Sequence, residues 1–243
     1  MNRKFGLLVY KNTYNLGDEI QSLAARQFLP SVDYHLDRDV FPQEGEFEES
    51  VKVILNGWFL HLRQGTHWPP PSQINPLLTS LHITPEAQGL LLSDAGVAYL
   101  KRHEPIGCRD LYTLGLMRRR GIKSFFSACL TVALTRPNVE RDPNLIVAND
   151  LSESMLVRIG SDTDKELVFT SHIGYPNDDI EQRFKKAESL LDTYARASCV
   201  VTTRLHCALP CLAMNTPVLL INPRRPGNFL HLWPGANSST LMP

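Results

Sequence analysis

The chain has 243 residues, of which 43% are hydrophobic and 21% are charged, an ordinary globular composition. Its 25 Lys and Arg balance its 25 Asp and Glu, so the charge gives no reason to expect binding to nucleic acid or to an anionic membrane. No segment approaches the ~20 apolar residues of a membrane span, and the apolar run after the basic N-terminus is too short for a signal peptide. We therefore expect a cytoplasmic protein with no transmembrane segment.

The first half of the chain alternates strand and helix signals. Short apolar runs predict strands at 5–10, 51–55, 105–108 and 125–134. Helix patterns with capping residues predict helices at 18–28, 93–103 and 111–120, the last closed by Gly121. The stretch 66–85 is rich in Pro, Ser, Asn and Thr, and we expect a long irregular loop there.

The second half repeats the alternation after an aperiodic stretch at 135–143 that contains two prolines. Strands are predicted at 144–148, 166–170, 199–203 and 217–221, with helices at 179–197 and 205–214. Alternating strands and helices indicate parallel sheets joined by crossover helices. We therefore predict an α/β fold of two Rossmann-like lobes with parallel sheets facing a cleft, spanning 1–138 and 139–243.

The five cysteines show no CxxC spacing and are odd in number, which favours reduced thiols over a disulfide framework. Cys207 and Cys211 lie four residues apart on a predicted helix beside His206. Structural zinc normally takes four ligands, and no further Cys or His pair lies nearby in sequence, so core packing is the better interpretation. We expect no metal site and no bound cofactor.

The most informative segment surrounds Arg204 and His206, where a buried strand gives way to a helix. Ligands of open α/β sheets bind at the carboxyl ends of strands, where helix N-termini attract anions. Arg204 offers a planar charged fork for a carboxylate or phosphate, and His206 can transfer a proton near neutral pH. The structural alternative, that Arg204 pairs with a carboxylate and His206 packs in the core, stays open.

A similar arrangement occurs in the first lobe, where Arg109 follows the predicted strand 105–108. Two arginines at equivalent strand ends could hold a dianion, although a surface ion pair would also explain Arg109. Asp110 is better explained as a helix N-cap.

Four further residues of the first lobe follow predicted strands or lie in the loop beyond them. Gly17 sits in the turn 15–18 after the first strand, which is not a dinucleotide fingerprint, and it would allow close approach of backbone or substrate. His61 follows the second strand, and His67 and His82 lie in the loop beyond; from the residues alone, each is better explained as a solvated loop histidine.

In their order and spacing these motifs resemble the polysaccharide pyruvyl transferase family. The matching segments are Asn15-Leu16-Gly17-Asp18 with Gln21, Ile54-Leu55-Asn56-Gly57-Trp58-Phe59, Pro105-Ile106-Gly107-Cys108-Arg109-Asp110, Phe125-Phe126-Ser127-Ala128-Cys129-Leu130-Thr131, Asp192-Thr193-Tyr194-Ala195-Arg196-Ala197, Thr203-Arg204-Leu205-His206-Cys207-Ala208-Leu209-Pro210 and Asn215-Thr216-Pro217-Val218. Together they cover most of the chain from Lys4 to Ile221.

The resemblance implies a glycosyltransferase-B-like fold with phosphoenolpyruvate, the donor substrate, bound between the lobes. It implies transfer of pyruvate onto sugar hydroxyls as a cyclic ketal, in the biosynthesis of an exopolysaccharide or cell-envelope glycan. Arg204, Leu205 and His206 match the family's donor-contacting motif, and Arg109 matches an arginine of the first lobe. A first-lobe histidine also belongs to the donor site, with His61 the first choice and His82 the second.

From the same resemblance we expect Asn15, Gly17, Asp18 and Gly57 to contact substrate. His206 and His61 are the expected catalytic residues. The family continues beyond Ile221 to complete its second lobe, whereas 222–243 is rich in Pro, Gly, Asn and Ser and predicts a shortened lobe. The alternatives are a nucleotide-sugar glycosyltransferase and a catalytically degenerate glycan-binding relative.

Overall fold

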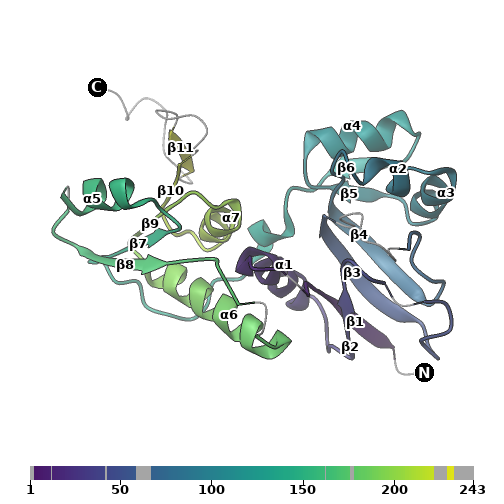
Figure 1. Ribbon diagram of the computed structural model, residues 1–243, viewed down its shortest axis with the longest axis horizontal. Helices are drawn as coiled ribbons and strands as arrows, with labels where there is room; N and C mark the ends of the chain where they lie inside the picture. The colour runs from purple at the N-terminus through teal and green to yellow at the C-terminus, as the bar shows by residue number, and fades with distance from the viewer. Residues whose placement is uncertain are drawn as a thin grey trace. The chain divides into compact units, whose positions relative to one another are not determined.

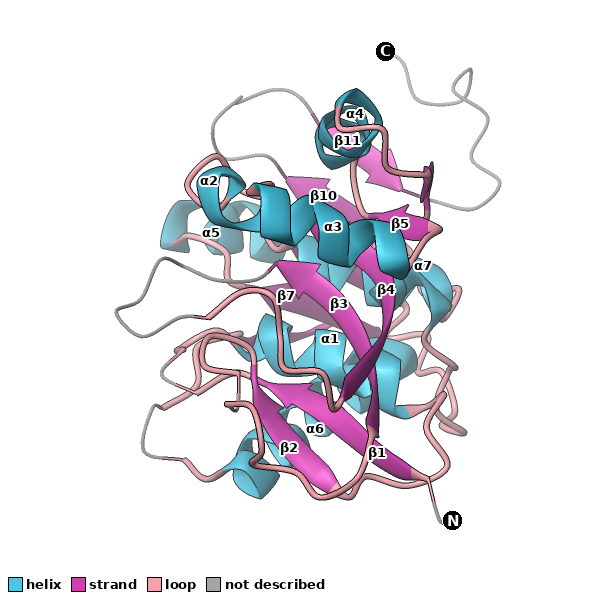
Figure 2. Ribbon diagram, turned by 90° about the vertical axis from the view of Figure 1, so that its right-hand side faces the viewer, coloured by secondary structure: helices cyan, strands magenta, loops and turns pink. Residues whose placement is uncertain are grey.

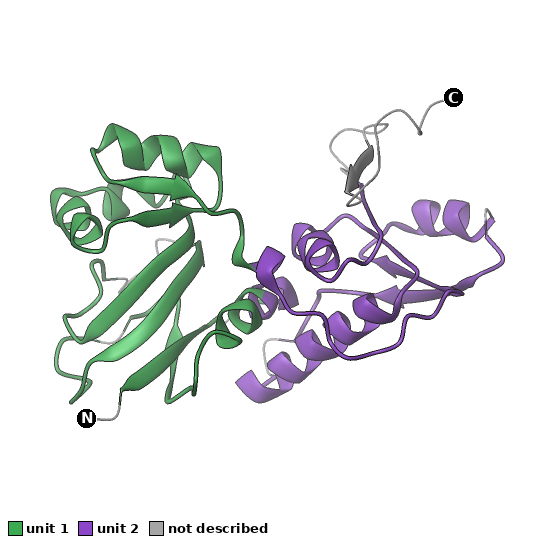
Figure 3. Ribbon diagram, turned by 180° about the vertical axis from the view of Figure 1, so that it is seen from behind, with its two compact units in different colours: residues 1–13, 21–130 green, residues 14–20, 131–243 purple. Residues whose placement is uncertain are grey.

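The computed structural model describes residues 3–11, 13–41, 43–58, 67–161, 163–175, 178–221 and 229–232. It divides into two compact units, coloured separately in Figure 3. Unit 1 comprises Met1–Thr13 and Gln21–Leu130, and unit 2 comprises Tyr14–Ile20 and Thr131–Pro243. Relative to the predicted contiguous lobes 1–138 and 139–243, the segment Tyr14–Ile20 therefore belongs with the second unit.

Unit 1 is built on a six-stranded, fully parallel sheet with the order β2-β1-β3-β4-β5-β6 (Figure 1). Its strands are β1 (Lys4–Val9), β2 (Tyr34–Asp37), β3 (Val51–Trp58), β4 (Ile74–His82), β5 (Ile106–Cys108) and β6 (Ser124–Phe126). Its helices are α1 (Leu16–Arg26), which begins in unit 2, α2 (Gln88–Leu91), α3 (Asp94–Arg102) and α4 (Leu111–Arg119).

Figure 2 shows the two longest strands of this sheet, β3 and β4, lying side by side. The core of unit 1 packs on them: Leu55 of β3, Leu78 and Leu81 of β4 and Leu100 of α3 are at most 1% exposed. Along β4, from Ile74 to Leu78, successive side chains alternate between the core and the surface. Leu77, on the opposite face from the buried Leu78, is therefore 60% exposed. The hydrophobic core therefore fixes the register of the strands whose carboxyl ends carry polar side chains.

Unit 2 has a five-stranded sheet with the order β11-β10-β9-β7-β8, parallel except for β11. The strands are β7 (Leu145–Asn149), β8 (Glu166–Thr170), β9 (Cys199–Thr202), β10 (Val218–Ile221) and β11 (Phe229–Leu232). The helices are α5 (Glu153–Ser161), α6 (Ile180–Arg196) and α7 (Leu205–Ala213), and the 3₁₀ helix η1 (Leu130–Ala133) joins the units in sequence. A mixed α/β fold with two largely parallel sheets is thus confirmed.

Helix α6 shows how local sequence sets the boundaries of an element. Asp179 and Gln182 form a reciprocal capping box at its start. One face of the helix buries Phe184, Ala187 and Tyr194, all at most 3% exposed. Cys207 and Cys211 of α7 are fully buried, so their predicted role in core packing is confirmed. All five cysteines are free thiols.

Two of the expected elements were wrong. The predicted loop 66–85 contains β4, whose β-branched and leucine residues alternate between core and surface although Pro76 lies within it. Strand β5 pairs with β4 only at Leu81, so most of that side of β4 has no strand partner among the described residues, a setting in which proline is tolerated. The predicted strand 125–134 is interrupted because Ala128 has a positive φ of 57°, and the 3₁₀ helix η1 follows.

Smaller differences concern element ends and short elements. Helix α1 begins at Leu16 rather than Asp18, and β2, α2 and α5 were not expected. Apart from β11, the segment 222–243 lies outside the described residues. Among the described helices, none combines the length and apolar character needed to cross a membrane.

Candidate functional site

The carboxyl ends of β7 and β9 in unit 2 place two polar turns side by side. Asn149 ends β7 and Asp150 follows it with a positive φ of 49°, while Arg204 follows β9 and is the N-cap residue of α7. The Thr202 hydroxyl accepts from the Arg204 backbone N–H at 2.9 Å and donates to Asn149 Oδ1 at 3.1 Å. These buried bonds tie the two strand ends together and orient the start of α7.

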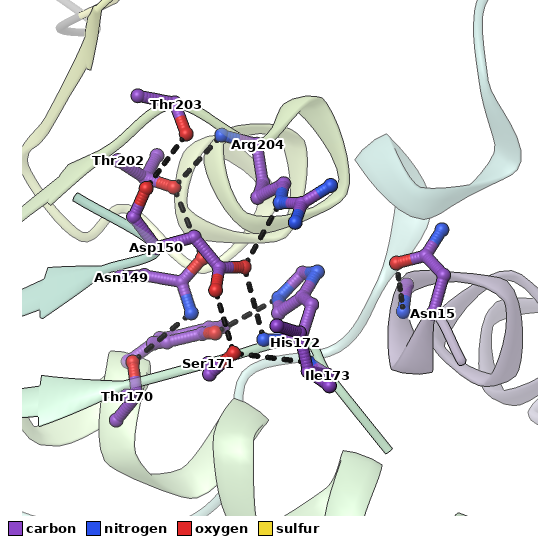
Figure 4. Close-up of polar contacts among 12 residues, drawn as sticks. Asn15, Asn149, Asp150, Thr170, Ser171, His172, Ile173, Thr202, Thr203 and Arg204 are labelled. Carbon is purple, nitrogen blue, oxygen red and sulfur yellow. Dashed lines mark hydrogen bonds and ion pairs between the residues drawn. The ribbon is translucent and has the colours of Figure 1, made fainter. Parts of the chain in front are cut away.

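Asp150 is the centre of this cluster (Figure 4). Its Oδ1 accepts from the Ser171 hydroxyl at 2.6 Å, and its Oδ2 accepts from the His172 backbone N–H at 3.0 Å and from Arg204 Nε at 2.9 Å. The Thr203 hydroxyl donates to the Asp150 carbonyl at 2.9 Å. The carboxylate is thus held by groups from two segments of unit 2, one after β8 and one after β9.

The Arg204–Asp150 ion pair confirms part of the structural alternative for Arg204, but it engages only one edge of the guanidinium. The Arg204 side chain is 44% exposed, whereas that of Asp150 is 9% exposed. The contact with Asp150 is made by Nε. Among the described residues the two Nη groups of Arg204 have no hydrogen-bond or ion-pair partner. A side chain anchored through Nε presents a pair of parallel N–H donors, the geometry that suits a carboxylate or phosphate.

Burial of Asp150 raises its pKa, but the Ser171 hydroxyl, the His172 N–H and the charge of Arg204 outweigh this and hold the pKa below its usual 3.8. Because the folded pKa is the lower one, ionised Asp150 stabilises the fold above its unfolded pKa, and this stabilisation is lost as the pH falls through the folded pKa.

We therefore expect the stability difference between the parent and Asp150→Asn to be constant above about pH 5 and to shrink as the pH falls below about 4. Urea unfolding of both proteins across this range measures it. Asp164→Asn, at an exposed carboxylate with no partner among the described residues, is the control and should show no such trend. A difference that grows towards low pH would contradict the assignment.

The N-terminus of α1 packs against the same cluster within unit 2. The Leu16 backbone N–H donates to the His172 carbonyl at 2.7 Å, and Asn15 Oδ1 accepts from the Gly17 N–H at 3.1 Å. A Cβ on Gly17 would lie 3.1 Å from His172 Nδ1 and 3.1 Å from the His206 Cβ. Gly17 therefore allows close approach, as expected, but to the side chains of two histidines.

His172 is almost fully buried at 1% exposure and was not singled out from the sequence. Its Nε2 lies 2.9 Å from the hydroxyl of Tyr194, a residue on the buried face of α6. This contact orients the imidazole away from solvent, so His172 supports the turn that holds Asp150. His206, in contrast, is half-buried in the first turn of α7, and the neighbouring Leu205 is 49% exposed.

The carboxyl edge of the unit 1 sheet carries a second polar cluster. Arg109 follows β5, and its backbone N–H donates to the Leu81 carbonyl of β4, so Arg109 and His82 end adjacent strands. Arg109 Nη1 donates to Gln21 Oε1 at 3.3 Å. Gly57 of β3 has a φ of +91°, and a Cβ there would lie 2.9 Å from the same Gln21 oxygen. Glycine is therefore required for both reasons at this strand end.

His82 and Asp110 form a dyad in this cluster, with His82 Nδ1 2.6 Å from Asp110 Oδ2. Asp110 is also the predicted N-cap of α4, since its Oδ1 accepts from the Thr113 backbone N–H at 2.8 Å. Burial raises the pKa of Asp110, but the Thr113 N–H and His82 outweigh it and the pKa is lowered. A carboxylate on Nδ1 fixes the imidazole and leaves Nε2 for proton transfer.

The expected residues thus fall into two groups. Unit 2 holds Arg204, Leu205, His206, Asn15, Gly17 and Asp18, and unit 1 holds Arg109, His82 and Gly57. His61 lies outside the described residues. His67 is an exposed residue before β4. The described residues contain no group of three or more His, Cys, Asp or Glu arranged to bind a metal ion.

Sequence reasoning missed Asp150, although one signal for it was present. It directly follows a predicted buried strand, the position in which polar residues of α/β proteins meet ligands. No charge pattern or motif around Asn149 and Asp150 indicated a contact with Arg204. The two residues of the ion pair, Asp150 and Arg204, are 54 positions apart in the sequence.

Both parallel α/β units place arginine and histidine at the carboxyl ends of strands, the edge of the sheet at which ligands of open α/β proteins bind. A family model described as polysaccharide pyruvyl transferase matches residues 15–225. The chain therefore belongs to the polysaccharide pyruvyl transferase family, and this membership supports a transferase role. The comparison with curated proteins finds no match.

Proposed function

We propose that this protein transfers the pyruvyl group of phosphoenolpyruvate to two hydroxyls of a sugar unit, forming a pyruvate ketal on a polysaccharide or glycan precursor. Family membership supports the class of reaction. The observation that carries the donor assignment is Arg204, whose Nε is anchored on Asp150 while its exposed Nη groups are without a partner among the described residues.

Phosphoenolpyruvate carries a carboxylate and a phosphate, and a guanidinium suits either group. Arg204 is proposed to bind one of these anions, and Arg109 is a further arginine proposed to contact the donor. Leu205, Asn15, Gly17, Asp18 and Gly57 are the further proposed substrate contacts. The donor is a substrate, and the proposal requires no additional cofactor.

The proposed reaction balances without a redox step. A proton adds to the methylene carbon of the donor, and this carbon becomes the methyl group. The oxygen of a sugar hydroxyl then bonds to the adjacent carbon. The bond from that carbon to the phosphate oxygen then breaks, and a second hydroxyl closes the ketal. The two hydroxyl protons end on the methyl group and on phosphate, with His206 as the proposed proton carrier.

The first-lobe histidine of the donor site is proposed to be His82. It ends β4 beside Arg109, and Asp110 holds its Nδ1, the arrangement expected of a proton-transferring imidazole. His61 was the first choice from the sequence and remains a candidate, because it lies outside the described residues. The proposed setting is the cytoplasm, which five free thiols suit, and an exopolysaccharide or cell-envelope glycan is the proposed acceptor.

Thermal unfolding in the presence of phosphoenolpyruvate tests the proposed donor. At a ligand concentration of about 100 times Kd, binding should stabilise the fold by about 2.7 kcal/mol and raise Tm. Pyruvate and inorganic phosphate, offered singly, should stabilise it less because each carries only one of the two anions. Stabilisation by a nucleoside diphosphate instead would favour a nucleotide-sugar glycosyltransferase, and stabilisation by none of these ligands would favour a degenerate glycan-binding relative.

Arg204→Ala should weaken phosphoenolpyruvate binding by roughly 10- to 100-fold, because a charged hydrogen bond contributes about 1.5–3 kcal/mol. Calorimetric titration of the donor measures the change. Arg158→Ala, which removes an exposed arginine of α5 in the same unit, is the matched control and should bind like the parent. Unchanged affinity in a folded Arg204→Ala protein would show that the donor binds elsewhere.

A further inference from the structure

Anion recognition by a flexible arginine depends on how firmly the side chain is oriented before the ligand arrives. An unrestrained arginine loses side-chain freedom on binding, and this loss reduces affinity. Arg204 is 44% exposed, so packing alone does not restrain its guanidinium. Its orientation must therefore come from a specific polar contact. Within the described residues, the Arg204 side chain forms a hydrogen bond and ion pair with Asp150 alone.

Asp150 is itself fixed more firmly than an ordinary surface carboxylate. Its backbone N–H donates to the Thr170 carbonyl at 3.0 Å, its own carbonyl accepts from Thr203, and Ser171 and the His172 N–H hold its two carboxylate oxygens. Its side chain is 9% exposed. The exposed arginine is thus tied to a nearly buried acceptor whose position is set by the ends of β7 and β8.

The choice of nitrogen matters for what Arg204 can still bind. The bond from Nε–H to Asp150 Oδ2 uses one side of the guanidinium and leaves the end formed by Nη1 and Nη2 without a bond to the carboxylate. In Figure 4 a dashed line joins the guanidinium to Asp150 through Nε, and none runs from the two Nη nitrogens to the residues drawn. A bidentate pairing of Asp150 with both nitrogens of the fork would instead have occupied donors needed for a ligand.

We propose that Asp150 is a positioning residue for the donor site: it locks Arg204 through Nε so that the Nη pair is preoriented for an anionic group of the donor. The proposal rests on the proposed function for the identity of the ligand. It makes Asp150, which does not touch the donor, a determinant of donor affinity, and it assigns Ser171 and the His172 backbone the role of holding Asp150.

The first experiment follows the Arg204 Nε–H group by heteronuclear NMR, with Arg204→Lys used to assign the signal. The parent and Asp150→Asn should both show an ordered, slowly exchanging Nε–H, because the asparagine oxygen can still accept this bond. Asp150→Ala should lose it. A signal that persists unchanged in Asp150→Ala overturns the proposal without reference to any ligand, and so independently of the proposed function.

The second experiment measures the Kd of phosphoenolpyruvate by calorimetry in a double-mutant cycle. Asp150→Ala should raise Kd by about 3- to 10-fold, the cost of ordering one long side chain, and Asp150→Asn should restore it to within about 2-fold of the parent. In the Arg204→Ala background Asp150→Ala should have no further effect, because its action passes through Arg204.

Asp178→Ala removes another aspartate of unit 2 that pairs with a cation, Lys186 at 2.6 Å, and should leave Kd unchanged. Equal loss of affinity on Asp150→Ala with and without Arg204 would overturn the proposal and indicate a structural role. Failure of Arg204→Ala to weaken binding would instead refute the proposed donor site, and failure of the parent to bind phosphoenolpyruvate would refute the proposed function. In both of those cases the NMR result still decides whether Asp150 orders Arg204.

Discussion

Replacing His206 with asparagine is expected to lower the rate of pyruvyl transfer by about 10²- to 10⁴-fold, the usual contribution of a positioned general acid or base. His206 lies in the first turn of α7, two residues after the arginine proposed to bind the donor, and it is half-buried. Asparagine retains hydrogen-bonding capacity near the backbone but cannot exchange a proton at neutral pH. Donor affinity should therefore change by less than about 3-fold, which separates the proton-transfer step from binding.

The measurement is phosphate release from phosphoenolpyruvate with a sugar acceptor that the parent uses, alongside a donor titration. His67→Asn, at an exposed histidine before β4, is the control and should behave like the parent. His82→Asn is the informative comparison, since Asp110 holds His82 in unit 1. If His82→Asn abolishes transfer while His206→Asn is fully active, the proton carrier belongs to unit 1 and our assignment of His206 is wrong.

The largest expected effect on stability comes from the buried ion pair between α1 and α6. Arg183 Nε lies 2.7 Å from Glu19 Oε1, and each side chain is 5% exposed. Burial raises the pKa of Glu19 against the opposing effect of Arg183, so desolvation offsets much of the attraction. Glu19→Ala should nevertheless destabilise the protein by about 3–5 kcal/mol, because it leaves a buried guanidinium without its counterion.

Urea unfolding measures this loss, and a double variant identifies its origin. Glu19→Leu combined with Arg183→Met replaces both charges by apolar groups and should recover most of the stability lost on Glu19→Ala. The exposed pair Asp178–Lys186 provides the control, with Asp178→Ala costing at most about 1 kcal/mol. A double variant as unstable as Glu19→Ala would show that the ion pair itself, rather than an uncompensated charge, stabilises unit 2.

Most regular elements could be predicted from local pattern. The amphipathic face of α6 and its capping residue, the N-cap of α4 at Asp110 and the strands β7, β8 and β9 all follow from periodicity and short-range chemistry. These features involve residues within a few positions of one another. Helix and strand preferences act over the same short range, so the sequence reports them directly.

Strand β4 marks the limit of that approach. Its Pro76, Thr79 and Ser80 are typical of a loop, and only pairing with β3 along seven registered positions makes it a strand. The opposite error occurred at 125–134, where a strand was predicted from an apolar run. The backbone there turns at Ala128, where the chain leaves the sheet. Tertiary context overrides local propensity in both places.

The sequence by itself determined that this is a parallel α/β protein with arginine and histidine at strand ends, because strand–helix alternation and motif spacing are local properties. Only the tertiary structure decided the partners of those side chains: Asp150 lies 54 residues from Arg204, Asp110 lies 28 from His82, and Glu19 lies 164 from Arg183. Such contacts depend on which strands become neighbours and in what register. That choice is made by burial of the whole core, which no short segment of the chain encodes.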